Sequence, residues 1–280
     1  MYGTLAADRP DQPRTPDRPD RPRDPGERQT TAFPALPPAT WRALDTVPVF
    51  LIALIVQLVV LAIVAPGIVS SHRETGLVHS CGAQFDVALV VTEGAFALAV
   101  VLWAGLVRGA RPTALGAPRR PLGDVGAGVL TGAILIGLGY VLLEIVVIVY
   151  TAMAGKKPPE PQQVDACVRG LSLALAGPAV VLAPPVGEEL LFRGFLYRGL
   201  RRRFSLWPSA LIASAFFGLS HLDFSSSNAM SRSAPLVIPL FVVGVGLAYV
   251  YERRQSLLAS MTAHAVFNLA GFIGIALSRR

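Results

Sequence analysis

Three short stretches of the sequence combine carboxylate, imidazole and amide side chains at helical spacing. The candidate site residues are Glu188, Glu189 and Arg193 in EELLFR, Phe217 and His221 in FGLSH, and His264 and Asn268 in HAVFN. Residues four positions apart share one face of a helix, so each stretch can present its polar groups together. A glutamate with a histidine can activate a water, and a histidine with an asparagine can donate hydrogen bonds to an oxyanion. Together these groups predict an enzyme that hydrolyses an amide bond.

The two adjacent glutamates are predicted to have different roles. Glu189 and Arg193 lie four residues apart, so they can form an ion pair. Glu188 is rotated by about 100° around the helix and has no local partner, which leaves it free to act as a general base. Pro184 and Pro185 are expected to break the helix just before the glutamates. Both carboxylates would then lie near the start of a new helical segment, whose dipole favours their charged form.

The candidate nucleophile is a water rather than a side chain. Ser220 directly precedes His221, and neighbouring residues on a helix face different directions. Cys81 and Cys167 fall in predicted loops. Direct attack by an activated water is therefore favoured over a covalent intermediate.

A bound zinc ion is the alternative means of activating the water. Two glutamates and two histidines are possible zinc ligands. The sequence, however, contains no H-E-x-x-H helix, and Glu189 is predicted to be engaged by Arg193. We therefore expect no metal and no cofactor, with a zinc-dependent protease that uses the same residues as an alternative.

The chain that carries these residues has the composition of a membrane protein. Of its 280 residues, 52% are hydrophobic and 15% are charged, whereas average soluble proteins carry about 25% charge. Several apolar runs reach about 20 residues, the length that crosses a hydrocarbon core of about 30 Å, and lipid requires them to be helical. The predicted fold is an all-α integral membrane protein with about seven transmembrane helices. The predicted spans are 47–69, 87–107, 125–152, 171–187 (helical to about 203), 206–222, 235–251 and 256–277.

Composition also divides the chain into two parts. Residues 1–45 form a Pro-, Arg- and Asp-rich tail with few apolar residues to bury, which predicts disorder. Residues 46–280 are predicted to form one polytopic membrane domain with its catalytic core in residues 170–275. The net charge of +7 comes from arginines in alternate loops, and this pattern predicts a cytoplasmic tail. The heavy use of Arg, Ala and Gly leads us to expect the cell membrane of a bacterium.

The same topology bears on the two cysteines and on possible partners. Cys81 and Cys167 both fall in loops on the predicted outer side, where an oxidising exterior allows a disulfide between them. No basic stripe with interleaved aromatic residues is present, so a nucleic-acid partner is not expected. The oligomeric state is not predicted.

The depths of the candidate site residues agree with one another. With about 1.5 Å per residue from the cytoplasmic ends of the spans, Glu188 lies about 20 Å deep, His221 about 22 Å, His264 about 12 Å and Asn268 about 18 Å. All four fall in the middle layer of a core of about 30 Å. An ionisable residue in a span costs about 2.5–3.5 kcal/mol, so their gathering at one depth favours a functional site.

Two further glutamates lie within predicted spans. Glu93 and Glu144 are each isolated in their span, with no other charged residue at helical spacing. We expect both to make buried structural hydrogen bonds. Tyr140, four residues before Glu144, is its candidate partner.

The three motifs E-E-x-x-x-R, F-x-x-x-H and H-x-x-x-N, in this order on membrane helices, resemble those of a known enzyme family. The chain is similar to the CPBP family of intramembrane endopeptidases, which includes the CAAX prenyl proteases of the Ras-converting type, over about residues 170–275. The resemblance implies an all-helical membrane enzyme that opens to the cytoplasmic side and works as a glutamate protease.

The resemblance also implies a role for each motif residue. Glu188 would activate the water and His221 would help to hold it, while His264 and Asn268 would be the oxyanion donors. Glu189, Arg193 and Phe217 would support them. The implied partners are membrane lipid and a hydrophobic or lipidated peptide substrate. A transporter, or a non-catalytic scaffold that binds hydrophobic peptides, is the remaining alternative.

Overall fold

A computed structural model of the chain describes residues 38–69, 83–118, 120–159, 171–224 and 227–277. The chain divides into two compact units, residues 1–32 and 33–280. All described residues belong to the second unit. Cys81 and Cys167, and with them the predicted disulfide, lie outside the described residues.

The regular elements of the described ranges are all helices, with no strand among them, which confirms the predicted all-α fold. The long helices are α1 (Thr46–Val69), α2 (Ala83–Leu102), α3 (Pro121–Ala154), α4 (Leu171–Glu189), α6 (Leu206–Leu219), α8 (Val237–Arg254) and α9 (Leu257–Leu277). The short helical segments are η1 (Ala43–Asp45), η3 (Trp103–Val107), η4 (Pro112–Leu115), η5 (Leu190–Tyr197), α5 (Arg198–Leu200), α7 (Ser227–Ser233) and η6 (Ala234–Leu236).

Five helices in the described part of the chain are long and apolar enough to cross a membrane. Their ranges are Ala43–Val60, Leu89–Val107, Pro121–Ala154, Met230–Arg254 and Leu257–Gly274. Helix α6 is also apolar but has only 14 residues. The described part of the chain therefore has several candidate membrane-spanning helices, and the protein is a membrane protein.

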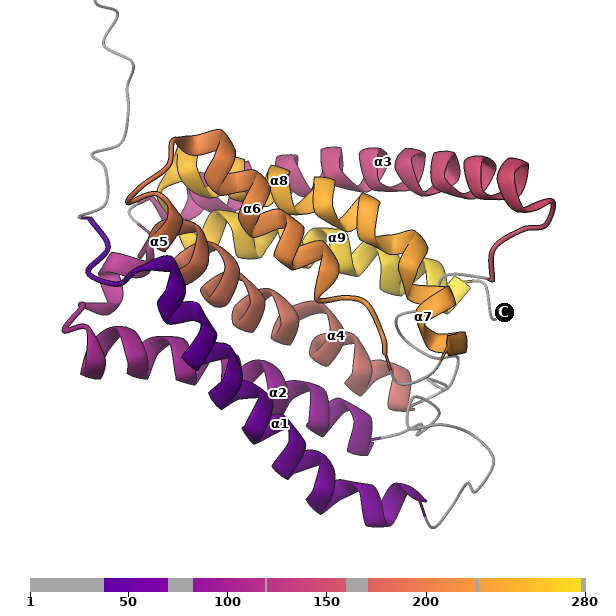
Figure 1. Cartoon of the computed structure of the whole chain (residues 1–280), viewed down its shortest axis with the longest axis horizontal. Helices are drawn as coiled ribbons and strands as arrows, with labels where there is room; N and C mark the ends of the chain where they lie inside the picture. Colours follow the sequence, from indigo (N-terminus) through magenta and orange to yellow (C-terminus); the bar gives the residue numbers. More distant parts are fainter. Residues whose placement is uncertain (1–37, 70–82, 119, 160–170, 225–226, 278–280) are drawn as a thin grey trace, which may run out of the picture. The chain divides into compact units, whose positions relative to one another are not determined.

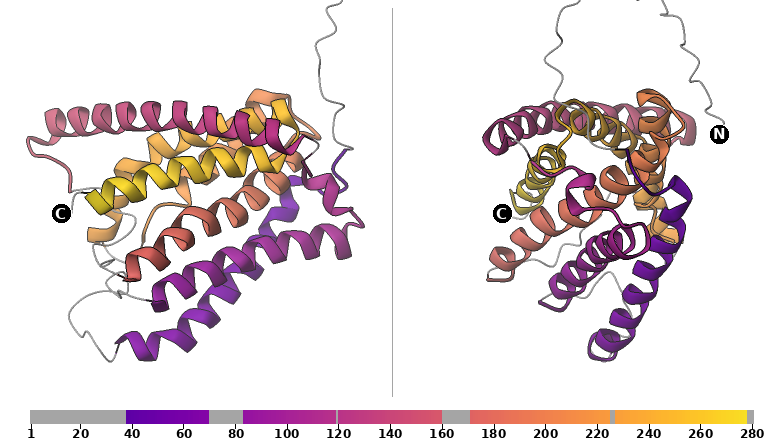
Figure 2. Two further views of the ribbon diagram at one scale, coloured as in Figure 1. Left: turned by 180° about the vertical axis from the view of Figure 1, so that it is seen from behind. Right: turned by 90° about the vertical axis from the view of Figure 1, so that its left-hand side faces the viewer.

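Helix α4 occupies the middle of the helix packing (Figures 1 and 2). It packs against α2 on one side and against α9 on the other. Helix α9 in turn packs along α3, and α8 packs along both α6 and α3, while α1 lies against α2. The elements that carry the three motifs, α4, α6 and α9, are thus brought together by packing around α4 and α8.

Helix α4 does not break at Pro184 and Pro185, so that part of the prediction is wrong. The helix runs through both prolines to Glu189 and continues as the π-helix η5. A proline has no N–H, so Pro184 leaves the carbonyl of Val180 without its helical donor. The Asn268 side chain supplies that donor, with Nδ2 3.3 Å from Val180 O. A partner on α9 therefore stabilises the uninterrupted helix. The predicted helical continuation to about residue 203 agrees with the observed end of α5 at Leu200.

Residues 38–45, which the prediction assigns to the disordered tail, pack against the helices. Trp41 is completely buried, and its indole N–H donates to the Phe195 carbonyl of η5 at 2.8 Å. The two rings stack with centroids 5.2 Å apart, and Arg202 donates to the Trp41 carbonyl at 3.0 Å. One large aromatic side chain supplies the buried area that anchors the segment. Residues 1–37 lie outside the described part of the chain.

Ion pairs tie together the ends of the helices at the arginine-rich end of the bundle. Arg201 donates to Glu252 through Nη2 at 2.7 Å and through Nε at 3.2 Å, and Tyr197 donates to the same carboxylate at 2.9 Å. The hydrogen bonds to Glu252 raise the pKa of Arg201 above its ordinary value. Arg254 pairs with the buried Asp124 at 2.9 Å, which connects α8 to α3. These contacts hold the helices that position the motifs.

Glu144 is exposed on α3, where the prediction expected a buried hydrogen bond. It lies 23 residues after the start of α3 at Pro121, or about 35 Å along the helix axis. That distance exceeds a hydrocarbon core of about 30 Å. The length of α3 therefore carries Glu144 to the far end of the bundle, away from the motifs.

Candidate active site

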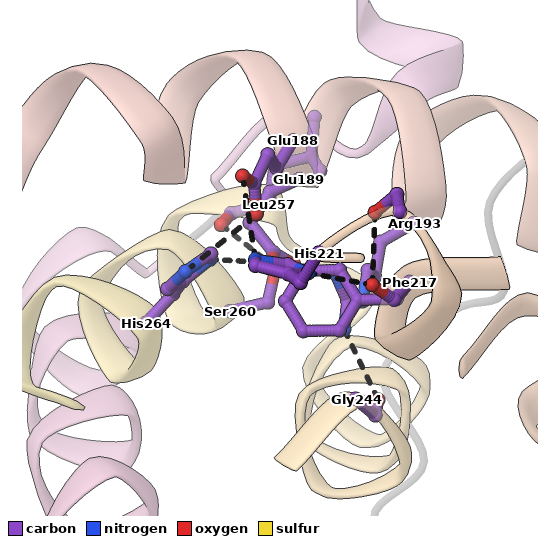
Figure 3. A network of polar contacts seen from close by, with 10 residues as sticks. Glu188, Glu189, Arg193, Phe217, His221, Gly244, Leu257, Ser260 and His264 are labelled. Atoms are coloured by element: carbon purple, nitrogen blue, oxygen red, sulfur yellow. Dashed lines mark hydrogen bonds and ion pairs between the residues drawn. The ribbon is translucent and has the colours of Figure 1, made fainter. Parts of the chain in front are cut away.

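The end of α4, the end of α6 and the middle of α9 bring the first glutamate and both histidines together (Figure 3). Oε1 of Glu188 lies 3.9 Å from Nε2 of His221. Oε2 of the same carboxylate lies 3.8 Å from Nε2 of His264. The Glu188 side chain is 17% exposed. This carboxylate therefore lies between two imidazoles and is still open to a small molecule.

Glu189 is bound on two sides and is completely buried. Its Oε1 accepts hydrogen bonds from Arg193 Nη1 at 2.8 Å and from His264 Nδ1 at 3.0 Å. The predicted ion pair with Arg193 is present, and the contact with His264 was not predicted. Arg193 is itself buried, and its Nη2 donates to the Gly244 carbonyl of α8 at 3.2 Å. Glu189 thus connects the charged group of η5 to the histidine of α9.

Phe217 packs at the centre of these groups and is completely buried. Its ring meets the rings of His221 and His264 edge to face, with centroids 4.9 and 5.7 Å apart. The Arg193 guanidinium carbon lies 4.4 Å from the centroid of the same ring, in a cation–π contact. A Cβ on Gly244 would lie 3.2 Å from Cδ1 of Phe217. The small residue on α8 therefore makes room for the ring that holds both imidazoles.

The hydrogen-bond partner of the His221 ring identifies which of its two nitrogens carries the hydrogen. Nδ1 lies 2.7 Å from the Phe217 carbonyl oxygen, and a carbonyl can only accept, so Nδ1 is the donor. Nε2 is left to face Glu188. Helix α6 ends at Leu219, and His221 follows in a turn, so the predicted span 206–222 extends slightly beyond the helix. The contact with Phe217 nevertheless keeps the imidazole over the helix end.

The same reasoning applies to His264, with a consequence for its role. Its Nδ1 donates to the Glu189 carboxylate, which can only accept. Nε2, which faces Glu188, therefore carries a hydrogen only when the ring is a positively charged imidazolium. A hydrogen bond from His264 to an oxyanion thus requires the imidazolium.

Asn268 lies on the same face of α9 as His264, one turn further along, as predicted from the spacing. Its amide nitrogen donates to Val180 O on α4, eight residues before Glu188. An amide group has two N–H hydrogens. One satisfies the carbonyl that Pro184 leaves free, and the second is available to another acceptor.

Glu93 is a residue that the sequence analysis placed outside the site. It is buried on α2, with only 7% of its surface exposed. A Cβ on Gly187 would lie 2.6 Å from the Glu93 carbonyl oxygen, so α2 and α4 approach closely beside Glu188. The charge of Glu188 acts on the Glu93 carboxyl. Glu93 therefore packs next to the first glutamate, and its Oε2 has no hydrogen-bond partner among the described residues, where a buried hydrogen bond was predicted.

The depth of Glu93 was the signal that could have identified it. Glu93 lies 14 residues before the end of its predicted span at residue 107, or about 21 Å from that end. Glu188 was placed about 20 Å deep by the same count. The agreement in depth indicated that the two carboxyls lie in one layer of the bundle.

The spacing of these groups also bears on metal ligation. Among the residues that the structure describes, no three His, Cys, Asp or Glu side chains are grouped so that they could hold a metal ion. Separations of 3.8 and 3.9 Å leave room for a water between Glu188 and each imidazole, because they exceed the length of a direct hydrogen bond.

Comparison with known proteins connects this geometry to a family. A family model described as type II CAAX prenyl endopeptidase Rce1-like matches residues 170–270. The matched segment contains the end of α4, the end of α6 and the middle of α9, and with them all three motifs. No curated protein and no solved structure matches the chain.

Proposed function

Because residues 170–270 form a domain of the type II CAAX prenyl endopeptidase Rce1-like family, which is a family of peptidases, we propose that the protein is an intramembrane endopeptidase. It hydrolyses a peptide bond with a water that Glu188 activates. The observation that carries this proposal is the Glu188 carboxylate, which lies within 4 Å of both imidazoles and whose Oε2 has no hydrogen-bond partner among the described residues.

The water binds between Glu188 and His221. With Nδ1 of His221 donating to Phe217 O, the neutral ring offers its Nε2 lone pair as an acceptor. A water between the two groups then donates one hydrogen to the Glu188 carboxylate and the other to His221. Its oxygen lone pairs are free to face a substrate carbonyl, which is the arrangement that general-base catalysis requires.

The substrate carbonyl oxygen faces the opposite imidazole. His264 as an imidazolium donates from Nε2, and the second N–H of Asn268 is the other donor. Donors that are already in place stabilise the negative charge that develops on this oxygen. Glu189 supports the step through Nδ1 of His264, and Arg193 and Phe217 hold Glu189 and the ring in position.

The proton and the electrons balance within this set of residues. The water oxygen bonds to the carbonyl carbon, its proton moves to Glu188, and the carbonyl π electrons move to the oxygen. The C–N bond then breaks as the carbonyl re-forms, and the leaving nitrogen takes the proton from Glu188. Glu188 returns to a carboxylate after each turnover, so no covalent intermediate is needed.

The substrate is proposed to be a hydrophobic or lipidated peptide in the membrane. The site lies among helices long and apolar enough to cross a bilayer, and Glu188 is part-exposed while Glu189 is buried. A peptide that partitions into lipid can reach a carboxylate at this depth without leaving the bilayer. We propose a multi-pass protein of the cell membrane with its N-terminal tail in the cytoplasm.

The test measures cleavage of a quenched-fluorescence membrane peptide by the purified full chain in detergent. Glu188→Gln should lower kcat by about 10²–10⁴-fold, the usual contribution of a general base. Glu144→Gln is the matched control, because Glu144 is exposed on α3, and it should cleave like the wild type. Full activity of Glu188→Gln would contradict the proposal.

A metal chelator separates the two protease mechanisms. In the glutamate mechanism, overnight treatment with a strong chelator leaves the rate unchanged. If the chelator abolishes activity and Zn²⁺ restores it, the protein is still a peptidase, but a metal rather than Glu188 activates its water. A wild-type protein that cleaves no peptide, yet moves a solute or a proton across liposomes, would favour the transporter instead.

A further inference from the structure

Glu93 is a buried carboxyl that the proposed reaction does not use. It lies on α2, and only 7% of its surface is exposed, so it is 93% buried. Its Oε2 has no hydrogen-bond partner among the described residues. A group of this kind is costly to bury as an anion, because nothing replaces the water that it loses.

Among the described residues, one charge acts on the Glu93 carboxyl across a helix interface. Across the α2–α4 interface that charge is Glu188, which follows Gly187, the residue against which Glu93 packs. The described face of α1 from Thr46 to Val60 has no titratable side chain. On η5, Arg193 is engaged by Glu189. Within the described part of the chain, no cation is therefore shown to compensate a negative charge on Glu93.

Two carboxylates that act on each other in a weakly polar setting do not both ionise readily. The negative charge falls on the carboxylate that is more exposed and has more polar neighbours. Glu188 is part-exposed and lies within 4 Å of two imidazoles. Glu93 is buried and has an unpartnered oxygen. The negative charge therefore belongs on Glu188, and the proton that remains belongs on Glu93.

We propose that Glu93 is a positioning residue that holds a proton in the working enzyme, so that the interface of α2 and α4 carries one negative charge and that charge is on Glu188. The inference rests on the proposed function of Glu188 as the base. Its consequence is electrostatic: the oxyanion develops beside a neutral Glu93 rather than beside a second anion. Ionisation of Glu93 at high pH would then oppose the reaction.

The first test does not depend on activity. Infrared spectra of the purified full chain in detergent at neutral pH should contain the carbonyl stretching band of a protonated carboxylic acid. The Glu93→Gln variant should lose this band, and the Glu188→Gln variant should keep it. Identical spectra for wild type and Glu93→Gln would overturn the inference, because Glu93 would then be ionised.

The second test uses the dependence of kcat/KM on pH. Glu93→Gln keeps the shape of a neutral carboxyl, so it should retain most of the wild-type activity at neutral pH. Its activity should persist to higher pH than that of the wild type, by at least about one pH unit, the scale of coupling between such groups. Glu144→Gln should show the wild-type profile.

Each possible outcome of the two tests bears on the protonation of Glu93 or on the proposed function. A Glu93→Gln profile that superimposes on the wild type, or activity lost at every pH, would overturn the inference. If the wild type cleaves no peptide, the proposed function fails while the infrared band still decides the state of Glu93. If Glu93→Gln does not fold, judged by size-exclusion elution, Glu93→Asp replaces it, and the band should shift rather than stay in place.

Discussion

At the scale of single residues, two neighbouring glutamates are distinguished by their surroundings. The Glu189 side chain is fully buried and accepts hydrogen bonds from Arg193 and His264. Glu188 has no such donor within hydrogen-bond distance, and both of its imidazole neighbours lie 3.8–3.9 Å away. The bound carboxylate stabilises the site, and the unbound one is free to take a proton.

The stability of two variants should separate these roles. Glu189→Gln leaves the buried Arg193 without an anion, and breaking a buried pair in this way costs about 3–5 kcal/mol. Glu188→Gln removes no direct hydrogen bond and should unfold like the wild type. The free energy of unfolding in detergent, measured with a denaturant, gives both values. Equal stability of the two variants would contradict the assignment of Glu189 as the structural member.

At the scale of elements, α4 is a proline-containing helix that depends on α9. Pro184 removes the donor for Val180 O, and Asn268 replaces it from 88 residues further along the chain. Beyond Glu189 the backbone continues as the π-helix η5, a geometry that often occurs at functional sites. The indole of Trp41 donates to Phe195 O within that π-helix. Both irregular parts of this continuous helical segment are thus stabilised by partners distant in sequence.

The contact between α4 and α9 can be tested with a double-mutant cycle. Asn268→Ala should cost about 1–3 kcal/mol of unfolding free energy, because it leaves the Val180 carbonyl unsatisfied. In a Pro184→Ala background, residue 184 regains an N–H that can bond to Val180 O, so the same substitution should cost much less. An equal cost in both backgrounds would show that Asn268 does not replace the missing helical donor.

At the scale of the whole molecule, the apolar surface and the arginines predict how the protein sits in a bilayer. Many large apolar side chains on the spanning helices are exposed, among them Leu130 of α3 and Leu58 of α1. The arginine-rich end contains Arg201, Arg202 and Arg203, which follow α5. Positive charge marks the cytoplasmic side of a membrane protein. That end is therefore predicted to face the cytoplasm.

Labelling of single cysteines in intact cells tests this orientation. In a background with Cys81→Ser and Cys167→Ser, a cysteine at the exposed Met153 near the end of α3 should react with a membrane-impermeant thiol reagent. A cysteine at the exposed Arg203 should react only after the membrane is permeabilised. The reverse pattern would invert the predicted topology and place the arginine-rich end outside.

The two glutamates outside the motifs show most clearly what spacing within one helix leaves undecided. Each lacks a charged partner at helical spacing in its own span, and both were predicted to make buried structural hydrogen bonds. Counting depth would have distinguished them: Glu93 falls about 21 Å from the end of its span at residue 107, and Glu144 about 28 Å from the start of its span at residue 125. Only the first matches the layer of Glu188. The packing of α2 against α4 then places Glu93 against Gly187, the residue before Glu188.

The sequence by itself determined the helices, the apolar spans, the motif residues and the Glu189–Arg193 pair, because each of these depends on composition or on spacing within one helix. Only the tertiary structure decided that Glu189 also binds His264, that α4 continues through its prolines, and that Glu93 packs against Gly187 next to Glu188. These features depend on how each helix is rotated about its axis and which neighbour it packs against. That choice comes from packing between segments far apart in the chain, which periodicity within a single span does not encode.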